Sequence, residues 1–135
     1  MTRTRTIFWT LALALVAATA ACRDATGPGR TPGTAVISLR SSTADGAVLV
    51  RVTGPGFATP QAIASGDVLY WRQNSATEIV VAVFGVIAAG PTFRVDVPDA
   101  GRIGEYQATV VQVADRFDAE RTDLTGYGAS LAVAQ

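Results

Sequence analysis

The sequence predicts an all-β fold, a single β-sandwich of about seven antiparallel strands after an N-terminal signal helix and a flexible tether. Short runs rich in Val, Ile, Leu and aromatic residues alternate with clusters of Gly, Pro, Asp and Asn, a spacing typical of all-β domains. No stretch after residue 22 keeps a helical period of 3.6 residues. Two stacked sheets are the economical way to bury so many half-apolar strands.

The first segment, residues 1–21, has the layout of a secretory signal peptide. Arg3 and Arg5 give a positively charged start, an apolar run of about 15 residues follows, and Ala20 and Ala21 provide small residues at its end. A membrane-spanning helix needs ~20 apolar residues, so this run is too short for a permanent anchor. It is apolar on every face, which argues against a core helix with one amphipathic stripe.

Cys22 follows directly and is the only cysteine of the chain. It has two interpretations: an ordinary small residue in a slightly longer signal, or the first residue of the mature chain, lipidated on its sulfur. A single thiol cannot form a disulfide within its own chain, and exported compartments oxidise free thiols. A lipid on the sulfur removes that liability.

The stretch that ends in Ala20, Ala21 and Cys22 resembles the lipobox of bacterial lipoproteins, although Thr19 stands where an aliphatic residue is usual. The resemblance implies a thioether-linked diacylglyceryl group on Cys22. Several acyl chains anchor stably because each buried CH₂ contributes ~0.8 kcal/mol. Arg23, rather than Asp, follows the cysteine, and this implies the outer membrane or cell surface more than the inner membrane.

Residues 22–34 contain the lipidated Cys and a linker of Gly, Pro, Thr and charged residues. This composition predicts a flexible tether that holds the domain away from the membrane. The β-sandwich domain is expected at residues 35–135. Its seven strands are predicted at residues 36–40, 47–53, 67–72, 78–84, 92–97, 106–114 and 128–134.

Side-chain alternation orients the predicted strands. Within residues 47–53, three valines should point inward while Leu49 and Arg51 point outward. Residues 78–84 are apolar on both faces, so this strand should be central and covered twice. Residues 92–97 alternate most cleanly, with Phe93, Val95 and Val97 inward and Thr92, Arg94 and Asp96 outward. Between these strands, residues 58–66 could hold one helical turn.

The composition excludes several kinds of chemistry. The chain has no histidine, and all eleven basic residues are arginine. It therefore has no Ser-His-Asp triad, no imidazole metal ligand and no lysine for a Schiff base. A catalytic site would rest on carboxylates alone, as in a glycosidase pair. Two arginines lie in the predicted signal, so the remainder is slightly acidic, which does not indicate a nucleic-acid-binding protein.

Several segments between residues 46 and 120 resemble the cohesin and carbohydrate-binding-module type of sandwich found in bacterial surface proteins. They are "GAVLVRVTGPG", "IVVAVFGVIAAGPTFRVDV" and "YQATVVQVADRFDAE". The resemblance implies a module that binds a protein or a glycan and does not catalyse.

A second sandwich family offers an alternative. The stretch "DAGRIGEY", from Asp99 to Tyr106, resembles the approach to strand F of immunoglobulin-type domains, without their inter-sheet cysteines. That resemblance implies a Tyr106 hydroxyl bonded back to the loop before it. The alternative is a tyrosine that is simply half-buried at a strand start.

Four carboxylates lie within nine residues, at Asp115, Asp118, Glu120 and Asp123. Oxygen-rich loops bind Ca²⁺. The spacing does not match the EF-hand pattern, and Arg116 and Arg121 offer counter-charges. A solvated loop is therefore favoured over a calcium site, and no cofactor is expected.

Tyr70 and Trp71 are the candidate ligand-facing aromatics. Neighbouring residues of a strand point to opposite faces, so one should be in the core and the other exposed. An exposed aromatic could stack on a sugar ring. The alternative is an edge aromatic covered by residues 61–66.

These observations together predict a membrane-anchored, exported lipoprotein whose sandwich is a non-catalytic binding module. Its partner would be an envelope or extracellular protein or glycan. Two alternatives stay open: a structural spacer or accessory subunit of an envelope complex, and a small carboxylate-dependent hydrolase. An exposed apolar patch would favour a protein partner, a Trp platform a glycan, and a uniformly polar surface a spacer.

Overall fold

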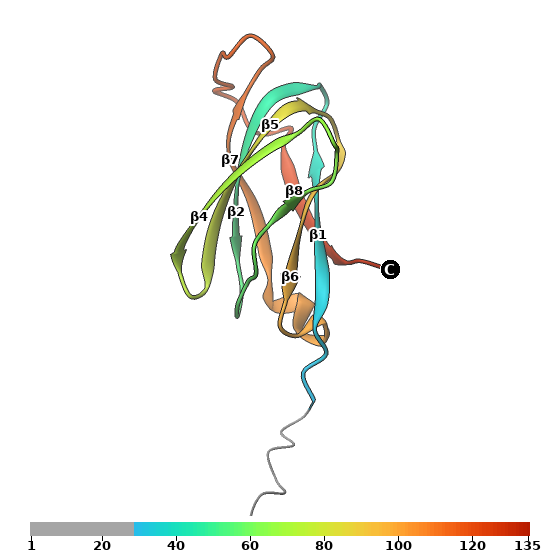
Figure 1. Cartoon of the computed structure of the whole chain (residues 1–135). Helices are drawn as coiled ribbons and strands as arrows, with labels where there is room; N and C mark the ends of the chain where they lie inside the picture. The colour runs from blue at the N-terminus through green and yellow to red at the C-terminus, as the bar shows by residue number, and fades with distance from the viewer. Residues whose placement is uncertain (1–28) are drawn as a thin grey trace, which may run out of the picture.

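A computed structural model describes residues 29–135 and confirms the all-β sandwich (Figure 1). The predicted signal peptide, Cys22 and most of the predicted tether lie outside the described residues. The strands are β1 (Gly33–Arg40), β2 (Asp45–Thr53), β3 (Gln61–Ala62), β4 (Val68–Ser75), β5 (Glu78–Ile87), β6 (Gly90–Val97), β7 (Gln107–Ala114) and β8 (Gly128–Val133). Among these residues no helix has the length and apolar character needed to cross a membrane.

The strands form two four-stranded sheets in which every pair is antiparallel. One sheet has the order β3-β6-β1-β8, and the other has the order β4-β5-β2-β7. The chain crosses between the sheets at nearly every connection, and only β4 and β5 form a hairpin within one sheet. Most consecutive strands therefore face each other across the core rather than pair edge to edge.

The core lies between the two sheets and is built from the inward side of each alternating strand. Val48, Val50 and Val52 are buried as predicted, and so are Phe93, Val95 and Val97. Arg94 and Asp96 are exposed as predicted, but Thr92 is buried. Its hydroxyl donates a hydrogen bond to the Gly90 carbonyl at 3.1 Å, which satisfies the polar group away from water.

Strand β5 is central in its sheet, between β4 and β2, as predicted. The prediction that it is covered on both faces is wrong. Ile79, Val81 and Val83 are fully buried, whereas Phe84 and Val86 on the opposite side are exposed. The domain has two layers, so each sheet meets a second layer on one face only.

Two local elements differ from the sequence expectation. Residues 58–66 form no helical turn; they contain β3, which pairs with β6 through Gln61 and Ala62. A 3-10 helix, η2 (Ala100–Glu105), instead precedes β7. Asp99 caps it, because its carboxylate accepts a hydrogen bond from the Gly101 N–H at 3.0 Å.

The two ends of the sandwich differ in what they carry (Figure 1). The chain enters the first strand beside η2, where the Ala100 N–H donates to the Thr31 carbonyl at 2.7 Å. The loops at residues 41–44 and 115–127 lie at the opposite end. These loops therefore face away from the N-terminal connection.

Candidate binding surface

The outer face of the β4-β5-β2-β7 sheet is apolar although it faces water. It is called here the outer apolar face, and its residues are Leu49, Val68, Tyr70, Ala82, Phe84 and Val86. The Tyr70 side chain is 66% exposed and Phe84 is 45% exposed. An antiparallel sheet with one solvated face normally carries polar residues there, so this face departs from the usual alternation.

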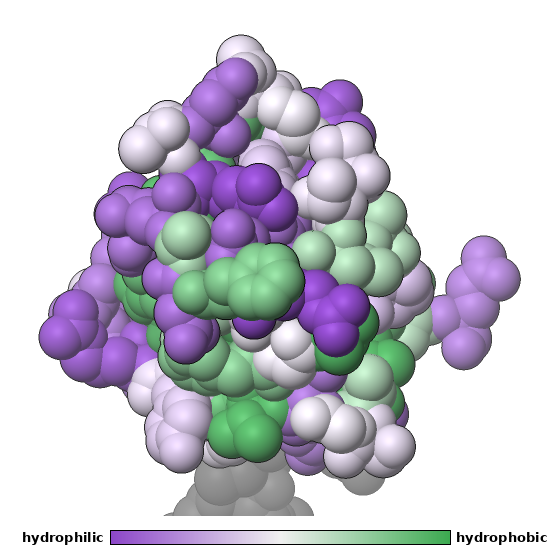
Figure 2. Space-filling model, turned by 90° about the horizontal axis from the view of Figure 1, so that it is seen from above, coloured by the Kyte–Doolittle hydropathy of each residue, from purple (hydrophilic) through white to green (hydrophobic). Residues whose placement is uncertain are grey.

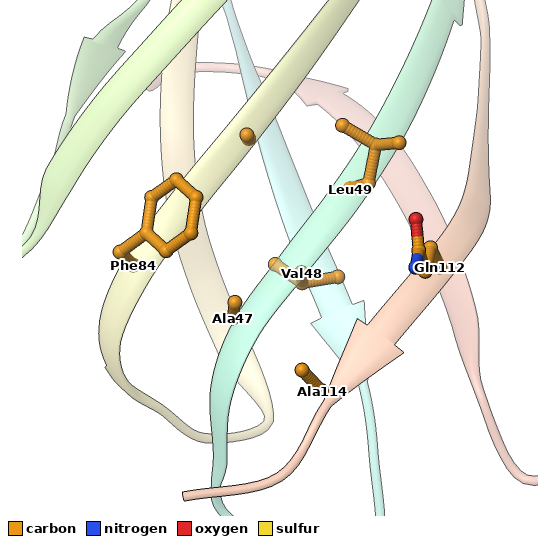
Figure 3. Close-up of a pocket in the computed structure, with 7 residues that line it drawn as sticks. Ala47, Val48, Leu49, Phe84, Gln112 and Ala114 are labelled. Carbon is orange, nitrogen blue, oxygen red and sulfur yellow. The ribbon is translucent and has the colours of Figure 1, made fainter. Parts of the chain in front are cut away.

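Two adjoining shallow hollows lie on this face. The first has a volume of about 220 Å³ and is lined by Leu49, Ala82, Phe84 and neighbouring residues of β2 and β7 (Figure 3). The second, of about 320 Å³, lies toward β4 and includes Tyr70 and Arg72. Leu49 and Ala82 border both hollows, so together they form one continuous apolar depression across the sheet.

The two exposed aromatic rings of this face touch each other edge to face. The ring centroids of Tyr70 and Phe84 are 6.0 Å apart, and the ring planes are inclined by 78°. This arrangement is a favourable aromatic pair. It does not form the flat pair of rings on which a sugar would stack.

Polar side chains border the outer apolar face at the end formed by the β4–β5 hairpin. The Arg72 Nε donates to Asn74 Oδ1 at 2.9 Å, and Asn74 Nδ2 donates to Glu78 Oε1 at 2.7 Å. Arg51 Nε lies 3.8 Å from the Glu78 carboxylate. Arg51 thus pairs with Glu78, and Arg72 bonds the neutral Asn74, so the charges stay at the rim and the centre is uncharged, as in protein interfaces.

Tyr70 and Trp71 are both exposed, so the prediction that one of them is in the core is wrong. Trp71 pairs with the core residue Val81 and thus belongs to the core-facing side, yet 41% of its surface remains exposed. The reason is that β4 is an edge strand and the edge strand of the facing sheet, β3, has only two residues.

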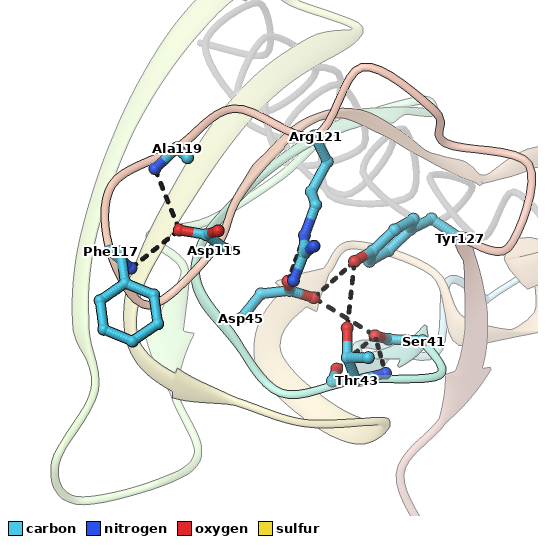
Figure 4. Close-up of polar contacts among 8 residues, drawn as sticks. All are labelled: Ser41, Thr43, Asp45, Asp115, Phe117, Ala119, Arg121 and Tyr127. Atoms are coloured by element: carbon cyan, nitrogen blue, oxygen red, sulfur yellow. Dashed lines mark hydrogen bonds and ion pairs between the residues drawn. The ribbon is translucent and has the colours of Figure 1, made fainter.

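The four loop carboxylates do not come together. Within residues 29–135, no group of three or more His, Cys, Asp or Glu side chains is placed to hold a metal ion. The Asp115 carboxylate accepts from the backbone N–H groups of Ala119 and Phe117, at 3.0 and 2.8 Å, and these bonds lower its pKa (Figure 4). Asp123 accepts from the Thr125 hydroxyl and N–H, which lowers the pKa of Asp123.

A buried polar cluster lies beneath the same loop, centred on Asp45 (Figure 4). Asp45 is fully buried. Arg121 Nε donates to its Oδ1 at 3.2 Å, the Tyr127 hydroxyl donates to its Oδ2 at 2.8 Å, and Ser41 Oγ lies 3.3 Å from Oδ2. The Asp45 carboxylate raises the pKa of Arg121. The cluster ties the loop at residues 115–127 to the start of β2.

Sequence reasoning missed the Asp45 cluster because its partners are distant in the chain. Arg121 and Tyr127 lie 76 and 82 positions away. Asp45 itself stands in a Ser, Thr, Asp and Gly stretch that is typical of a turn. The only available signal is that this Asp immediately precedes an alternating apolar strand.

The loop end above this cluster is largely hydrophilic. Figure 2, which looks down on this end, shows hydrophilic residues over its upper and left part and hydrophobic residues at its centre and toward its lower and right edges. An open polar hollow of about 510 Å³ lies here, with Thr43, Glu120 and Asp123 among its lining residues. The aromatic side chain of Phe117 is 90% exposed on the same loop.

Tyr106 is buried, and its hydroxyl is hydrogen-bonded. The hydroxyl donates to the Gly56 carbonyl at 3.0 Å, and the ring packs edge to face on Phe57 with centroids 5.6 Å apart. Burial raises the pKa of Tyr106. The bond reaches the loop after β2, fifty positions earlier, and not the segment from Asp99 as the immunoglobulin resemblance implies.

The fold and this surface define a two-sheet all-β protein with one exposed apolar sheet face. No protein-family model, curated protein or solved structure matches the chain. The resemblances to bacterial lipoproteins and to cohesin-type sandwiches stay predictions from the sequence pattern.

Proposed function

We propose that this chain is an exported lipoprotein, anchored through a lipid on Cys22, whose sandwich is a non-catalytic binding module. Its partner is an envelope or extracellular protein that docks on the outer apolar face. The observation that carries this proposal is the exposure of Tyr70, Phe84 and Val86 to solvent on one sheet face, where the first two rings are in contact.

The composition of the face favours a protein over a glycan. Protein interfaces combine an uncharged core, enriched in aromatic residues, with a polar rim. The outer apolar face has such a centre, and Arg51, Arg72 and Glu78 stand at its rim. A glycan site would need a flat exposed ring with hydrogen-bonding groups around it, whereas Tyr70 and Phe84 meet edge to face.

The loop end is a second exposed region at which a partner would make contact. It lies opposite the N-terminal connection, so an anchored domain would present it away from the membrane (Figure 1). Its surface is polar, and its long loop is held in place by Asp45. The spacer role is the alternative if neither surface binds a partner.

The binding proposal is tested by affinity capture from detergent-solubilised envelope. Residues 23–135 carry every described strand and the whole buried core, so this domain is immobilised without the lipid. We expect a retained protein that the Phe84→Lys variant loses, because a lysine ammonium in the centre of the face is costly to desolvate. Ser130→Lys, which adds the same charge on the exposed side of the other sheet, is the matched control and should retain the protein.

Either of two results would contradict the proposal. The folded wild-type domain retains no specific protein, or the two variants retain it equally. The first result favours the spacer hypothesis, and the second places the contact elsewhere on the domain.

The anchor is tested separately, by growing cells with a fatty-acid analogue. We expect label on the wild-type chain and none on the Cys22→Ser variant, because the thioether needs the sulfur. Equal labelling of both chains would refute lipidation at Cys22. It would not affect the binding proposal, which the affinity capture tests.

A further inference from the structure

We propose that β4 is an association edge at which a second copy of this chain adds its own β4, so that two β4-β5-β2-β7 sheets become one continuous sheet. This inference goes beyond the binding of a foreign protein on the outer apolar face. It rests on the edge of the sheet, on the side-chain pattern of β4 and on the exposure of Trp71.

Strand β4 has no partner on its outer side among the described residues. Its backbone pairs only with β5, which leaves every second N–H and C=O directed at solvent. A long exposed edge of this kind is a template for a further strand. Proteins usually block such edges with proline, lysine or a bulge, and the stretch from Val68 to Arg72 has none of these.

The other three edge strands are short, partly paired at the edge, or close to the facing sheet. Strand β3 has two residues. The chain after β7 folds back on that strand, where the Arg121 N–H donates to the Val113 carbonyl at 2.8 Å. Strand β8 packs against β7 on that side of the sandwich. Among the described residues no further backbone segment pairs with the outer side of β4, whereas β7 is paired there at its C-terminal end.

The side chains of β4 are self-complementary in one antiparallel register. With a two-fold axis at Tyr70, each Leu69 lies opposite the partner's Trp71, and each Val68 lies opposite the partner's Arg72. The Leu69–Trp71 pairs lie on the core-facing side, where they would cover the exposed part of Trp71. Cross-strand pairs of aromatic and aliphatic side chains are the unit that stabilises a sheet.

Charge does not oppose this register. Arg72 is the only charged residue of β4. The two copies of Arg72 would be separated by four residues, about 14 Å along the paired strands. That distance exceeds the ~8 Å Debye length at physiological ionic strength, so their repulsion is screened.

The register also fixes the geometry of the pair. Antiparallel pairing runs the two domains in opposite directions, so their N-terminal ends leave from opposite ends of the dimer, and the pair would join copies anchored in facing surfaces rather than copies side by side in one membrane. A single added strand makes a small interface, so we expect a reversible dimer of modest affinity.

Sedimentation velocity of residues 23–135, from about 10 μM to about 1 mM, measures this association. We expect a concentration-dependent shift from monomer to dimer. Tyr70→Lys should weaken the dimer at least about tenfold, because like charges then face each other at the axis. Val86→Lys is the matched control: Val86 is exposed on the same face, on β5 beyond its pairing with β4, and the change should leave the dimer unchanged.

Cysteine cross-linking tests the register itself, because residues 23–135 contain no cysteine. Tyr70→Cys should form a disulfide-linked dimer under mild oxidation, and Ser75→Cys, at the far end of the same strand, should not. A monomer up to about 1 mM would overturn the proposal. Loss of the dimer in Val86→Lys would overturn it too, since the contact would then be the outer apolar face.

Discussion

Among single residues, Asp45 is the one that holds the loops at one end of the domain in position. Its carboxylate is fully buried, and three side chains place polar atoms around it: Ser41, Arg121 and Tyr127. A buried charge persists only when it is paired and hydrogen-bonded. The position of the loop at residues 115–127 therefore depends on this one side chain.

Arg121→Gln should lower the free energy of unfolding by about 1–3 kcal/mol, because it leaves the buried Asp45 carboxylate without its counter-charge. The lower part of this range is expected, since the Arg121 side chain is itself partly exposed. Urea denaturation measures the change. Arg116→Gln, on the same loop but exposed and with no ion pair among the described residues, should change it little. Equal losses in the two variants would contradict the role given to Asp45.

Tyr106→Phe should cost about 1 kcal/mol of unfolding free energy, because it removes one buried hydrogen bond, to the Gly56 carbonyl, and keeps the ring. Thermal and urea denaturation give the value. Tyr70→Phe is the matched control, since the Tyr70 side chain is exposed. If Tyr106→Phe is no more destabilising than its control, the hydroxyl does not hold the loop after β2.

At the scale of strands and loops, sequence periodicity predicted what each strand contributes to the core. The alternation in β2 and β6 identified their buried apolar residues because a two-residue period has one physical cause, burial of one face. It missed the buried polar residues Asp45 and Thr92. It could not identify the exposed apolar side of β5. Apolar side chains that face a partner and apolar side chains that face a core have the same sequence pattern.

The sequence also did not predict which strands lie at the edges of the sheets. Trp71 is exposed because β4 lies at an edge and β3 opposite it is short, and both facts come from strand order. The Asp45 cluster was not predicted for the same reason, since its side chains come together only when the sheets pack. Local patterns thus predicted the elements, and long-range packing decided which surfaces remain free.

The loop after β7 should loosen in acid. Backbone N–H groups of Ala119 and Phe117 lower the pKa of Asp115 below the ordinary 3.8. A lowered folded-state pKa stabilises the loop above about pH 3.8, and this contribution is lost as the pH falls through the lower value. Faster amide exchange of Phe117 and Ala119 below that pH is the expected signature. Protection that stays constant down to full protonation of Asp115 would contradict it.

On the scale of the whole molecule, three regions of the sandwich lie apart from one another. The N-terminal connection and η2 lie at one end, the polar loops lie at the other, and the outer apolar face and the β4 edge lie between them (Figure 1). A domain anchored through Cys22 would therefore present its apolar face sideways, along the membrane, to a neighbouring protein.

Site-specific photo-cross-linking of the full chain in living cells tests this arrangement most directly. A photoreactive side chain replaces Phe84 on the outer apolar face or, as the control, Arg94 on the exposed side of the other sheet. We predict a discrete cross-linked protein from position 84 and none from position 94. The same cross-links from both positions, or none from position 84 in a chain shown to be exported and folded, would contradict it.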